Sequence, residues 1–386
     1  MTLSGPVPAE EMGAEDRWAL AAAEMHLSRG DRESAVDAFF ALRPRLGLPA
    51  AWGLARAWEA VGRLEDAAAL FAGVAVEAGA RGDWQLQVRA LISGSRCRAE
   101  IGEDVAALDD ALAARDVAVE RGLSGTDEHA QALSALVGRF YTVGDLVQAD
   151  RTARELLAMV DAGATWKARG SAYWNAAGVA EASGDIDTAV RYAERALALL
   201  GEGDDDRAWA RCAVACAWFW MRHDAVADHL DQIERLLSDA RSKLETCGTE
   251  VDLAYTETEL ARATLLAGRP DQAVAWAESA LRRIGAEPRP ETGTALLVLG
   301  EAHLARADSV SVMDAAGRLE MTLLALPPSR RAALAWRGLA ALWRGVNDQD
   351  AAYRALEQAL NAQAVPPSPG GKAVQRSHFD DQQPIQ

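Results

Sequence analysis

The sequence predicts an all-α protein, a right-handed superhelical solenoid of about nine helical hairpins with a period near 40 residues. Half of the residues are apolar, which is enough for a continuous core. A glycine is followed five residues later by an alanine six times, at Gly30/Ala35, Gly62/Ala67, Gly102/Ala107, Gly144/Ala149, Gly184/Ala189 and Gly268/Ala273. Four consecutive glycine-to-glycine steps are 32, 40, 42 and 40 residues, and the fifth, of 84, fits two units of which one has lost its glycine. Such internal similarity at a fixed step indicates stacked repeats.

Each glycine is expected to end the first helix of a hairpin in the left-handed region, and each alanine to leave room for the second helix. The first five and the seventh hairpins have the turn segments SRGDRESA, AVGRLEDA, EIGEDVAA, TVGDLVQA, ASGDIDTA and LAGRPDQA. These segments resemble the inter-helix turn of tetratricopeptide repeats, in which an aromatic or small residue and a further alanine follow. Phe39 and Phe71 fill the first of these positions, and Ala196 and Ala280 the second. The period exceeds the ~34 residues of that family and approaches the ~40–47 of HEAT and armadillo repeats, but the turn segments favour long tetratricopeptide units.

Three further units lack the turn glycine. Residues 332–360 place Trp336 and Trp343 at the large positions of a first helix, and Ala352 and Ala359 at the alanine positions of a second. Residues 293–326 contain the matching pair Leu299-Gly300, and residues 208–240 form the most degenerate unit. The solenoid is therefore expected to span residues 15–361, with a disordered leader at 1–14 and a disordered tail at 362–386.

Charge and cysteine content restrict the function. The formal net charge is −17 and the isoelectric point is near 4.9, which opposes direct binding of nucleic acid. The acidic surface is explained by solubility, or alternatively by a basic partner. The four cysteines form no CxxC pair, and no apolar run reaches the ~18 residues of a membrane span, so a cytoplasmic protein without membrane attachment is expected.

No catalytic or cofactor motif is present in the sequence, so we expect no enzyme activity and no cofactor. Cys212 and Cys216 lie four residues apart in an apolar helical stretch, which favours small buried side chains over a metal site. Among the tryptophans, the repeat template places four in the core and three on the inner groove. The core set is Trp58, Trp218, Trp336 and Trp343, and the groove set is Trp174, Trp209 and Trp220. For the groove set, packing in the core is the alternative to ligand contact.

The resemblance implies a concave groove that is lined by the first helices and binds a peptide or protein segment. Its ligand-contacting positions fall here on Arg89, Arg96, Tyr141, Trp174, Asn175, Tyr255 and Arg262. Asn175 could pair with the N–H and C=O of a bound backbone, and inward arginines could hold a carboxylate. The competing explanation for the three arginines is an ordinary salt bridge with neighbouring acids.

Residues 171–222 also resemble the sensor region of actinobacterial helix-turn-helix regulators of the xenobiotic-response type. They read SAYWNAAGVAEASGDIDTAVRYAERALALLGEGDDDRAWARCAVACAWFWMR. No helix-turn-helix text precedes Trp18, so the resemblance implies a DNA-binding domain that was lost, removed or supplied by another chain. The first hypothesis is a ligand-switched regulatory protein, and the alternatives are a constitutive adaptor or an enzyme on a solenoid scaffold. The sequence does not decide whether the protein forms a homodimer.

Overall fold

The computed structural model describes residues 12–161, 165–285 and 288–363, and within them it contains eighteen α-helices and no strand. The helices form nine antiparallel hairpins. Their first helices are α1 (Ala14–Ser28), α3 (Leu48–Ala60), α5 (Trp84–Glu100), α7 (Asp127–Val143), α9 (Trp166–Ala182), α11 (Asp206–Met221), α13 (Glu250–Leu266), α15 (Pro290–Ala305) and α17 (Arg330–Gly345). Their second helices are α2 (Arg32–Leu46), α4 (Leu64–Arg81), α6 (Asp104–Glu120), α8 (Leu146–Asp161), α10 (Ile186–Leu200), α12 (Val226–Cys247), α14 (Pro270–Ile284), α16 (Ser309–Leu324) and α18 (Gln349–Gln363).

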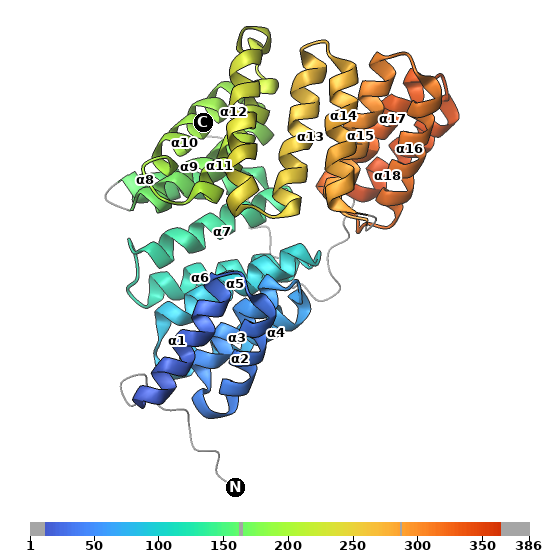
Figure 1. Ribbon diagram of the computed structural model, residues 1–386. Coiled ribbons are helices and arrows are strands. Elements are labelled where there is room, and N and C mark those ends of the chain that lie inside the picture. The colour runs from blue at the N-terminus through green and yellow to red at the C-terminus, as the bar shows by residue number, and fades with distance from the viewer. Residues whose placement is uncertain (1–11, 162–164, 286–287, 364–386) are drawn as a thin grey trace, which may run out of the picture.

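The hairpins stack in chain order, from α1–α4 at one end to α15–α18 at the other (Figure 1). Each helix packs against the next, and first helices also pack against one another, as α7 does against α9 and α13 against α15. The second helices cover one side of this layer of first helices. The predicted all-α, tetratricopeptide-like solenoid is therefore confirmed.

The six turn glycines adopt the conformation that the sequence predicted. All have a positive φ, between +73° and +85°, and the residue after each glycine donates its N–H to a carbonyl five residues earlier, as Arg63 does to Trp58 at 2.9 Å. The six alanines that follow these turns have no exposed surface. Glycine adopts this φ without strain, and the alanine methyl allows the two helices to approach closely.

The three hairpins without a turn glycine fall into two kinds. In the eighth and ninth hairpins, Ala307 (φ 57°) and Asn347 (φ 63°) occupy the left-handed position. The turn of the sixth hairpin, residues 222–225, contains no residue with positive φ, and it leads into α12, whose 22 residues exceed every other second helix. The sixth unit has thus changed its turn type, whereas the other two kept the turn and replaced the glycine.

The core is a series of clusters between neighbouring hairpins, as expected of a repeat protein. Phe39 and Phe71 are fully buried, and Trp336 is buried in the cluster of the last three hairpins. Trp58, Trp218 and Trp343 pack half-buried against such clusters, consistent with their predicted core positions.

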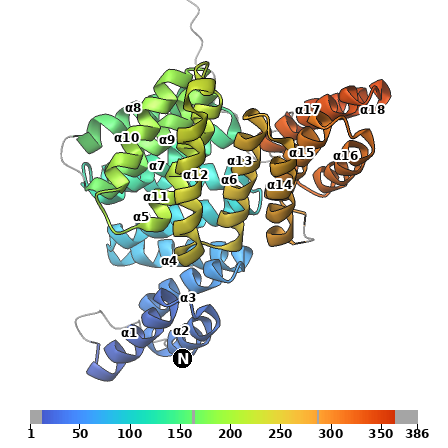
Figure 2. The same ribbon diagram turned by 45° about the horizontal axis from the view of Figure 1, so that its top comes forward.

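The solenoid winds far enough for late units to meet an early one. A Cβ added to Gly102, in the turn between α5 and α6, would lie 3.6 Å from Pro327 Cγ, in the loop between α16 and α17. Figure 2 shows α11, α12 and α13 passing in front of α5 and α6. The turn at Gly102 is therefore a point where distant parts of the chain converge.

The first described helix, α1, begins at Ala14, and the last, α18, ends at Gln363. Nearly all of the predicted leader and tail, residues 1–11 and 364–386, lies outside the described residues. Among the helices that are described, none combines the length and the hydropathy needed to cross a bilayer.

Candidate functional site

Side chains of the first helices, and that of Arg222 directly after α11, bridge every pair of consecutive hairpins, and we call this series the inner-wall ladder. Because the second helices cover the other side, these partly exposed pairs lie on the uncovered, inner side of the solenoid. The rungs, in chain order, are Glu24–Arg56, Glu59–Arg96, Arg89–Glu128, Ser134–Asn175, Glu181–Arg222, Arg207 and Arg211 with Asp252, Arg262–Glu301, and Glu291–Arg331. Seven of these eight rungs are ion pairs.

Most rungs bury the carboxylate and expose the arginine. Glu128 is 7% exposed and Arg89 is 51% exposed, and Glu181 at 8% faces Arg222 at 50%. The same asymmetry holds at Asp252, Glu59 and Glu291. Each buried carboxylate is neutralised by a guanidinium that keeps unused N–H donors, because an arginine has five of them. The inner wall of this acidic protein therefore offers unused hydrogen-bond donors, and its buried carboxylates carry no uncompensated negative charge.

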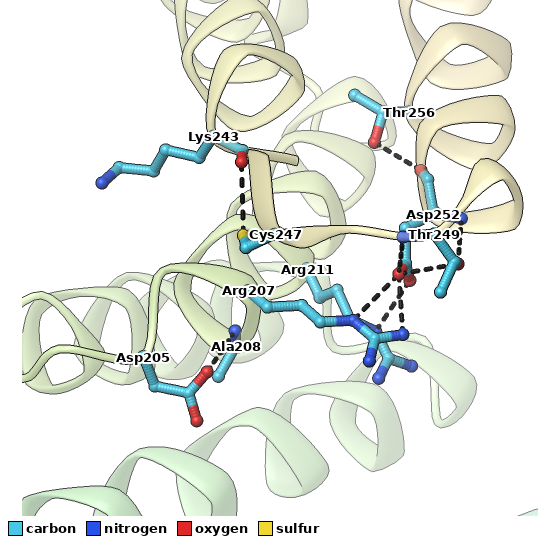
Figure 3. Close-up of polar contacts among 9 residues, drawn as sticks. All are labelled: Asp205, Arg207, Ala208, Arg211, Lys243, Cys247, Thr249, Asp252 and Thr256. Carbon is cyan, nitrogen blue, oxygen red and sulfur yellow. Dashed lines mark hydrogen bonds and ion pairs between the residues drawn. The ribbon is translucent and has the colours of Figure 1, made fainter. Parts of the chain in front are cut away.

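Asp252 organises the most connected rung (Figure 3). Arg207 reaches it from α11 at 2.8 Å and Arg211 at 3.6 Å. The N–H and hydroxyl of Thr249 also donate to it, at 3.0 and 2.9 Å, in a capping box that starts α13. Burial alone would raise the pKa of Asp252, but the hydrogen bonds from Thr249 and the charge of Arg207 outweigh burial and lower it. One carboxylate thus fixes the start of α13 and its contact with α11.

Four of the seven predicted groove residues belong to the ladder. Arg89 donates from Nε to Glu128 at 3.1 Å, and Arg96 donates from Nη2 to Glu59 at 3.0 Å. Asn175 donates from Nδ2 to Ser134 Oγ at 2.9 Å. Arg262 donates to Glu259 within α13 and also lies 3.8 Å from Glu301. Salt bridges with neighbouring acids, the competing explanation for the three arginines, are therefore present.

The other three predicted residues lie on the same first helices. The Arg211 guanidinium is 5.8 Å from the ring centre of Trp174, so Trp174 adds an aromatic contact between α9 and α11. Burial, reinforced by the charge of Glu259, raises the pKa of Tyr255. Tyr141 is half-buried in the last turn of α7. The seven residues are therefore spread along the wall from α5 to α13 and do not form one compact cluster.

Trp209 and Trp220 follow the core-packing alternative, because both contact second helices. Trp220 donates from Nε1 to Glu194 of α10 at 3.2 Å, and its ring centre is 4.1 Å from that of His229 in α12. Lys243 of α12 lies 5.2 Å from the ring of Trp209. The two tryptophans are eleven residues apart, about three helical turns, so they share one face of α11, and this face meets the second helices.

No group of histidine, cysteine or acidic side chains suited to a metal ion exists among the residues that the structure describes. Cys212 and Cys216 are buried, as predicted, and burial raises the pKa of Cys216 to about 12. These thiols are protonated at neutral pH and behave as small apolar side chains.

Sequence reasoning missed Arg139, Arg207, Arg211, Arg222 and Arg331 as inner-wall residues. A signal for some of them exists, because ladder partners are separated by nearly one repeat. The separations are 37 residues for Glu59 and Arg96, 39 for Arg89 and Glu128, and 40 for Glu291 and Arg331. Opposite charges one period apart would have identified these rungs. Glu100 precedes Arg139 by 39 residues and acts on it through space, so the same search would also have pointed to Arg139.

Comparisons with known proteins agree on the fold. No family profile matches the sequence, and no curated protein matches it either. A Rap protein solved in complex with competence and sporulation factor is 12% identical, with a TM-score of 0.58 over 91% of this chain and 99% of that one. The apo form of RapI is 11% identical, with a TM-score of 0.56 over 90% and 97% of the two chains. At these identities the likeness establishes the tetratricopeptide-like fold alone.

Proposed function

We propose that this protein is a non-enzymatic binding module whose inner wall takes a peptide or protein segment. We place it in the cytoplasm, with a regulatory or sensor role related to the tetratricopeptide transcription regulators that residues 171–222 resemble. The observation that carries the proposal is the ladder, which lines the wall with guanidinium groups held over buried carboxylates. The complex between a Rap protein of the same fold and competence and sporulation factor supports it.

An extended segment along the wall would bind through the donors that the ladder leaves unused. Arg96 and Arg262 have N–H groups beyond those given to Glu59 and Glu259, and these would donate to backbone carbonyls or to a carboxylate. The side-chain oxygen of Asn175 has no partner among the described residues, and it would accept a backbone N–H while Nδ2 stays bound to Ser134. Trp174 would supply an apolar surface beside Asn175.

We expect a segment bound in this way to change the curvature of the solenoid. Each rung joins two units, so a ligand that draws an arginine toward itself changes the packing at that interface. Small rotations at successive interfaces add along a repeat array and change the distance between its ends. The ligand must bind one curvature more tightly than the other for the shift to occur.

A constitutive adaptor is the second candidate, and the unbroken ladder favours it. Eight bridged interfaces resist rotation, so the same wall could present a fixed surface to a folded partner. The two candidates predict different solution behaviour. The sensor changes its small-angle X-ray scattering profile when its ligand is added, and the adaptor does not.

Mass spectrometry of material that co-purifies with the tagged protein tests the proposal. The variant Asn175→Ala/Arg96→Ala alters the inner wall. The matched control Arg154→Ala/Arg282→Ala removes two arginines that are 77% and 69% exposed on second helices. We expect a peptide or protein segment that wild type and control retain and the inner-wall variant loses. A partner retained equally by all three forms would show that the inner wall is not the binding surface.

A further inference from the structure

Arg139 of α7 differs from the other arginines of the inner wall. Among the described residues it makes no ion pair and no hydrogen bond, and its Nη1 atom is enclosed without a hydrogen-bond partner. Burial lowers the pKa of its guanidinium. Glu257 shows the contrast, because one of its oxygens is also enclosed without a partner but the other accepts from Arg241 and Arg283.

Charged side chains surround Arg139, but none of the described ones forms an ion pair with its guanidinium. Glu100 at the end of α5 and Asp104 at the start of α6 act on it through space, within the range of Coulomb attraction and beyond that of an ion pair. Burial raises the pKa of both carboxyl groups. Arg96, on the same helix as Glu100, is the remaining charge that acts on Arg139.

This place is also where the solenoid converges on itself. Arg211 of α11 acts on the Glu100 carboxyl group through space and partly opposes the rise in its pKa that burial causes, although α5 and α11 belong to the third and sixth hairpins. Gly102 lies between Glu100 and Asp104, and a Cβ added to it would lie 3.6 Å from Pro327 Cγ in the loop before α17. A segment leaving the inner wall at the fourth hairpin would therefore pass Arg139 between an early and a late part of the array.

A desolvated guanidinium without a contact partner is costly to keep, and removing one partner of a buried pair strongly destabilises proteins. Enclosed polar atoms without partners in native proteins call for an explanation, and perturbed groups in clefts concentrate at functional sites. A carboxylate satisfies an arginine with two parallel hydrogen bonds.

We propose that Arg139 is a carboxylate-binding subsite of the inner wall, which receives an acidic side chain or the C-terminal carboxylate of the bound segment. The inference rests on the proposed function and specifies the chemistry of the ligand. It assigns to Arg139 a recognition role that the charge of the whole chain, −17, would not suggest.

The test uses defined tripeptide probes and the full chain. Acetyl-Gly-Glu-Gly-amide and acetyl-Gly-Gln-Gly-amide differ only in the side-chain carboxylate, and acetyl-Gly-Gly-Gly with a free or an amidated end differs only in the terminal one. We expect the Nε–H NMR signal of Arg139 to shift with the carboxylate member of at least one pair and not with its neutral partner. The pair that responds identifies the source of the carboxylate.

Variants separate recognition from structure. Arg139→Gln should weaken binding of the responding probe at least about tenfold, and Arg139→Lys should recover part of it. Without probe, Arg139→Gln should unfold at the same denaturant concentration as wild type or a higher one, because it removes an unpaired desolvated charge. The control Arg154→Gln, on an exposed arginine that pairs with Asp150, should bind the probe as wild type does.

Two results would overturn the assignment. One is an Arg139 signal that shifts with no probe. The other is an Arg139→Gln variant that unfolds at lower denaturant and binds the probe like wild type, which would make Arg139 a structural partner of Glu100 and Asp104. If the co-purified segment binds wild type and Arg139→Gln equally, the proposed function stands and the subsite fails. If no segment co-purifies, the proposed function fails, and the probe titration still decides the subsite.

Discussion

The rung between Arg89 and Glu128 offers a direct test of what holds consecutive first helices together. Arg89 donates from Nε to the Glu128 carboxylate at 3.1 Å, and its Nη2 donates to the same oxygen. Glu128 is 7% exposed, whereas Arg89 is half exposed. Arg89→Gln therefore leaves a buried carboxylate without its counter-ion, while Glu128→Gln leaves an arginine that water can solvate. We expect the first change to be the more damaging.

The magnitude follows from the burial of the two partners. Breaking a fully buried ion pair costs about 3–5 kcal/mol, and exposed pairs contribute ~0.2–1 kcal/mol. With one partner buried and the other half exposed, Arg89→Gln should lower the free energy of unfolding by about 2 kcal/mol. The coupling free energy from the double-mutant cycle should be about 1–2 kcal/mol. Arg63, just before α4, and Asp66, in the first turn of α4, are both about half exposed. They provide a control pair that should couple by less than ~0.5 kcal/mol.

Urea denaturation of the four proteins in each cycle measures the coupling through the midpoint and slope of the transition. Because repeat arrays can unfold in parts, hydrogen exchange of the α5 and α7 amides should accompany it. We expect Arg89→Gln to lower protection in both helices. If the Arg89–Glu128 coupling is no larger than that of Arg63 and Asp66, the ladder does not stabilise the interface and our reasoning is refuted.

The same cycle has a predictable pH dependence. Burial acts to raise the pKa of Glu128, but the hydrogen bond and charge of Arg89 outweigh it, so the folded-state pKa lies below the ordinary value. A carboxyl group of this kind stabilises the fold above its unfolded-state pKa, and the contribution is lost as pH falls through the folded-state value. The coupling should therefore persist at about pH 7 and vanish on acidification below about pH 4. A coupling that is unchanged by acid would contradict the assignment.

Three further predictions concern the fold. Gly53→Ala should lower the thermal midpoint, because the new Cβ would lie 2.1 Å from Phe39 Cε1. Overpacking of this kind costs about 1–3 kcal/mol, which exceeds the ~1 kcal/mol gained in helix propensity. A midpoint at or above that of wild type would count against this packing. Gly144→Ala, at φ +83°, should cost about 1–2 kcal/mol in urea denaturation, and an unchanged midpoint would argue against the left-handed turn. Iodoacetamide at neutral pH should modify exposed Cys247 and spare buried Cys97, whose pKa burial raises to about 12; equal modification by mass spectrometry would exclude this difference.

The fold could be predicted from the sequence because its turns depend on single residues. Gly30 and its five equivalents stand where the chain needs a positive φ, and Ala35 and its equivalents stand where only a methyl fits. Both requirements are local and steric, so they restrict the sequence at a fixed step. In the eighth and ninth hairpins, Ala307 and Asn347 adopt the same left-handed conformation without a glycine. A search for the glycine pattern does not detect these two turns.

The sequence could predict which side of the solenoid carries the candidate site, but not the pairing of its side chains. The repeat template put Arg89, Arg96, Asn175 and Arg262 on the layer of first helices, and the structure shows each of them in a rung. It did not fix the side of α11 on which Trp209 lies, and the structure places Lys243 of α12 5.2 Å from the Trp209 ring.

Net charge was a poor guide to the inner wall for a physical reason. The value of −17 is a sum over the whole chain, whereas recognition depends on which charges are exposed where a ligand passes. Burying Glu128, Glu181 and Asp252 beneath arginines removes negative charge from the wall without changing the sum. The separation of partners is more informative than their total. An acid and an arginine one repeat apart can be neighbours on consecutive first helices of a stacked array, so opposite charges at that spacing indicate which carboxylates of the wall are neutralised by pairing.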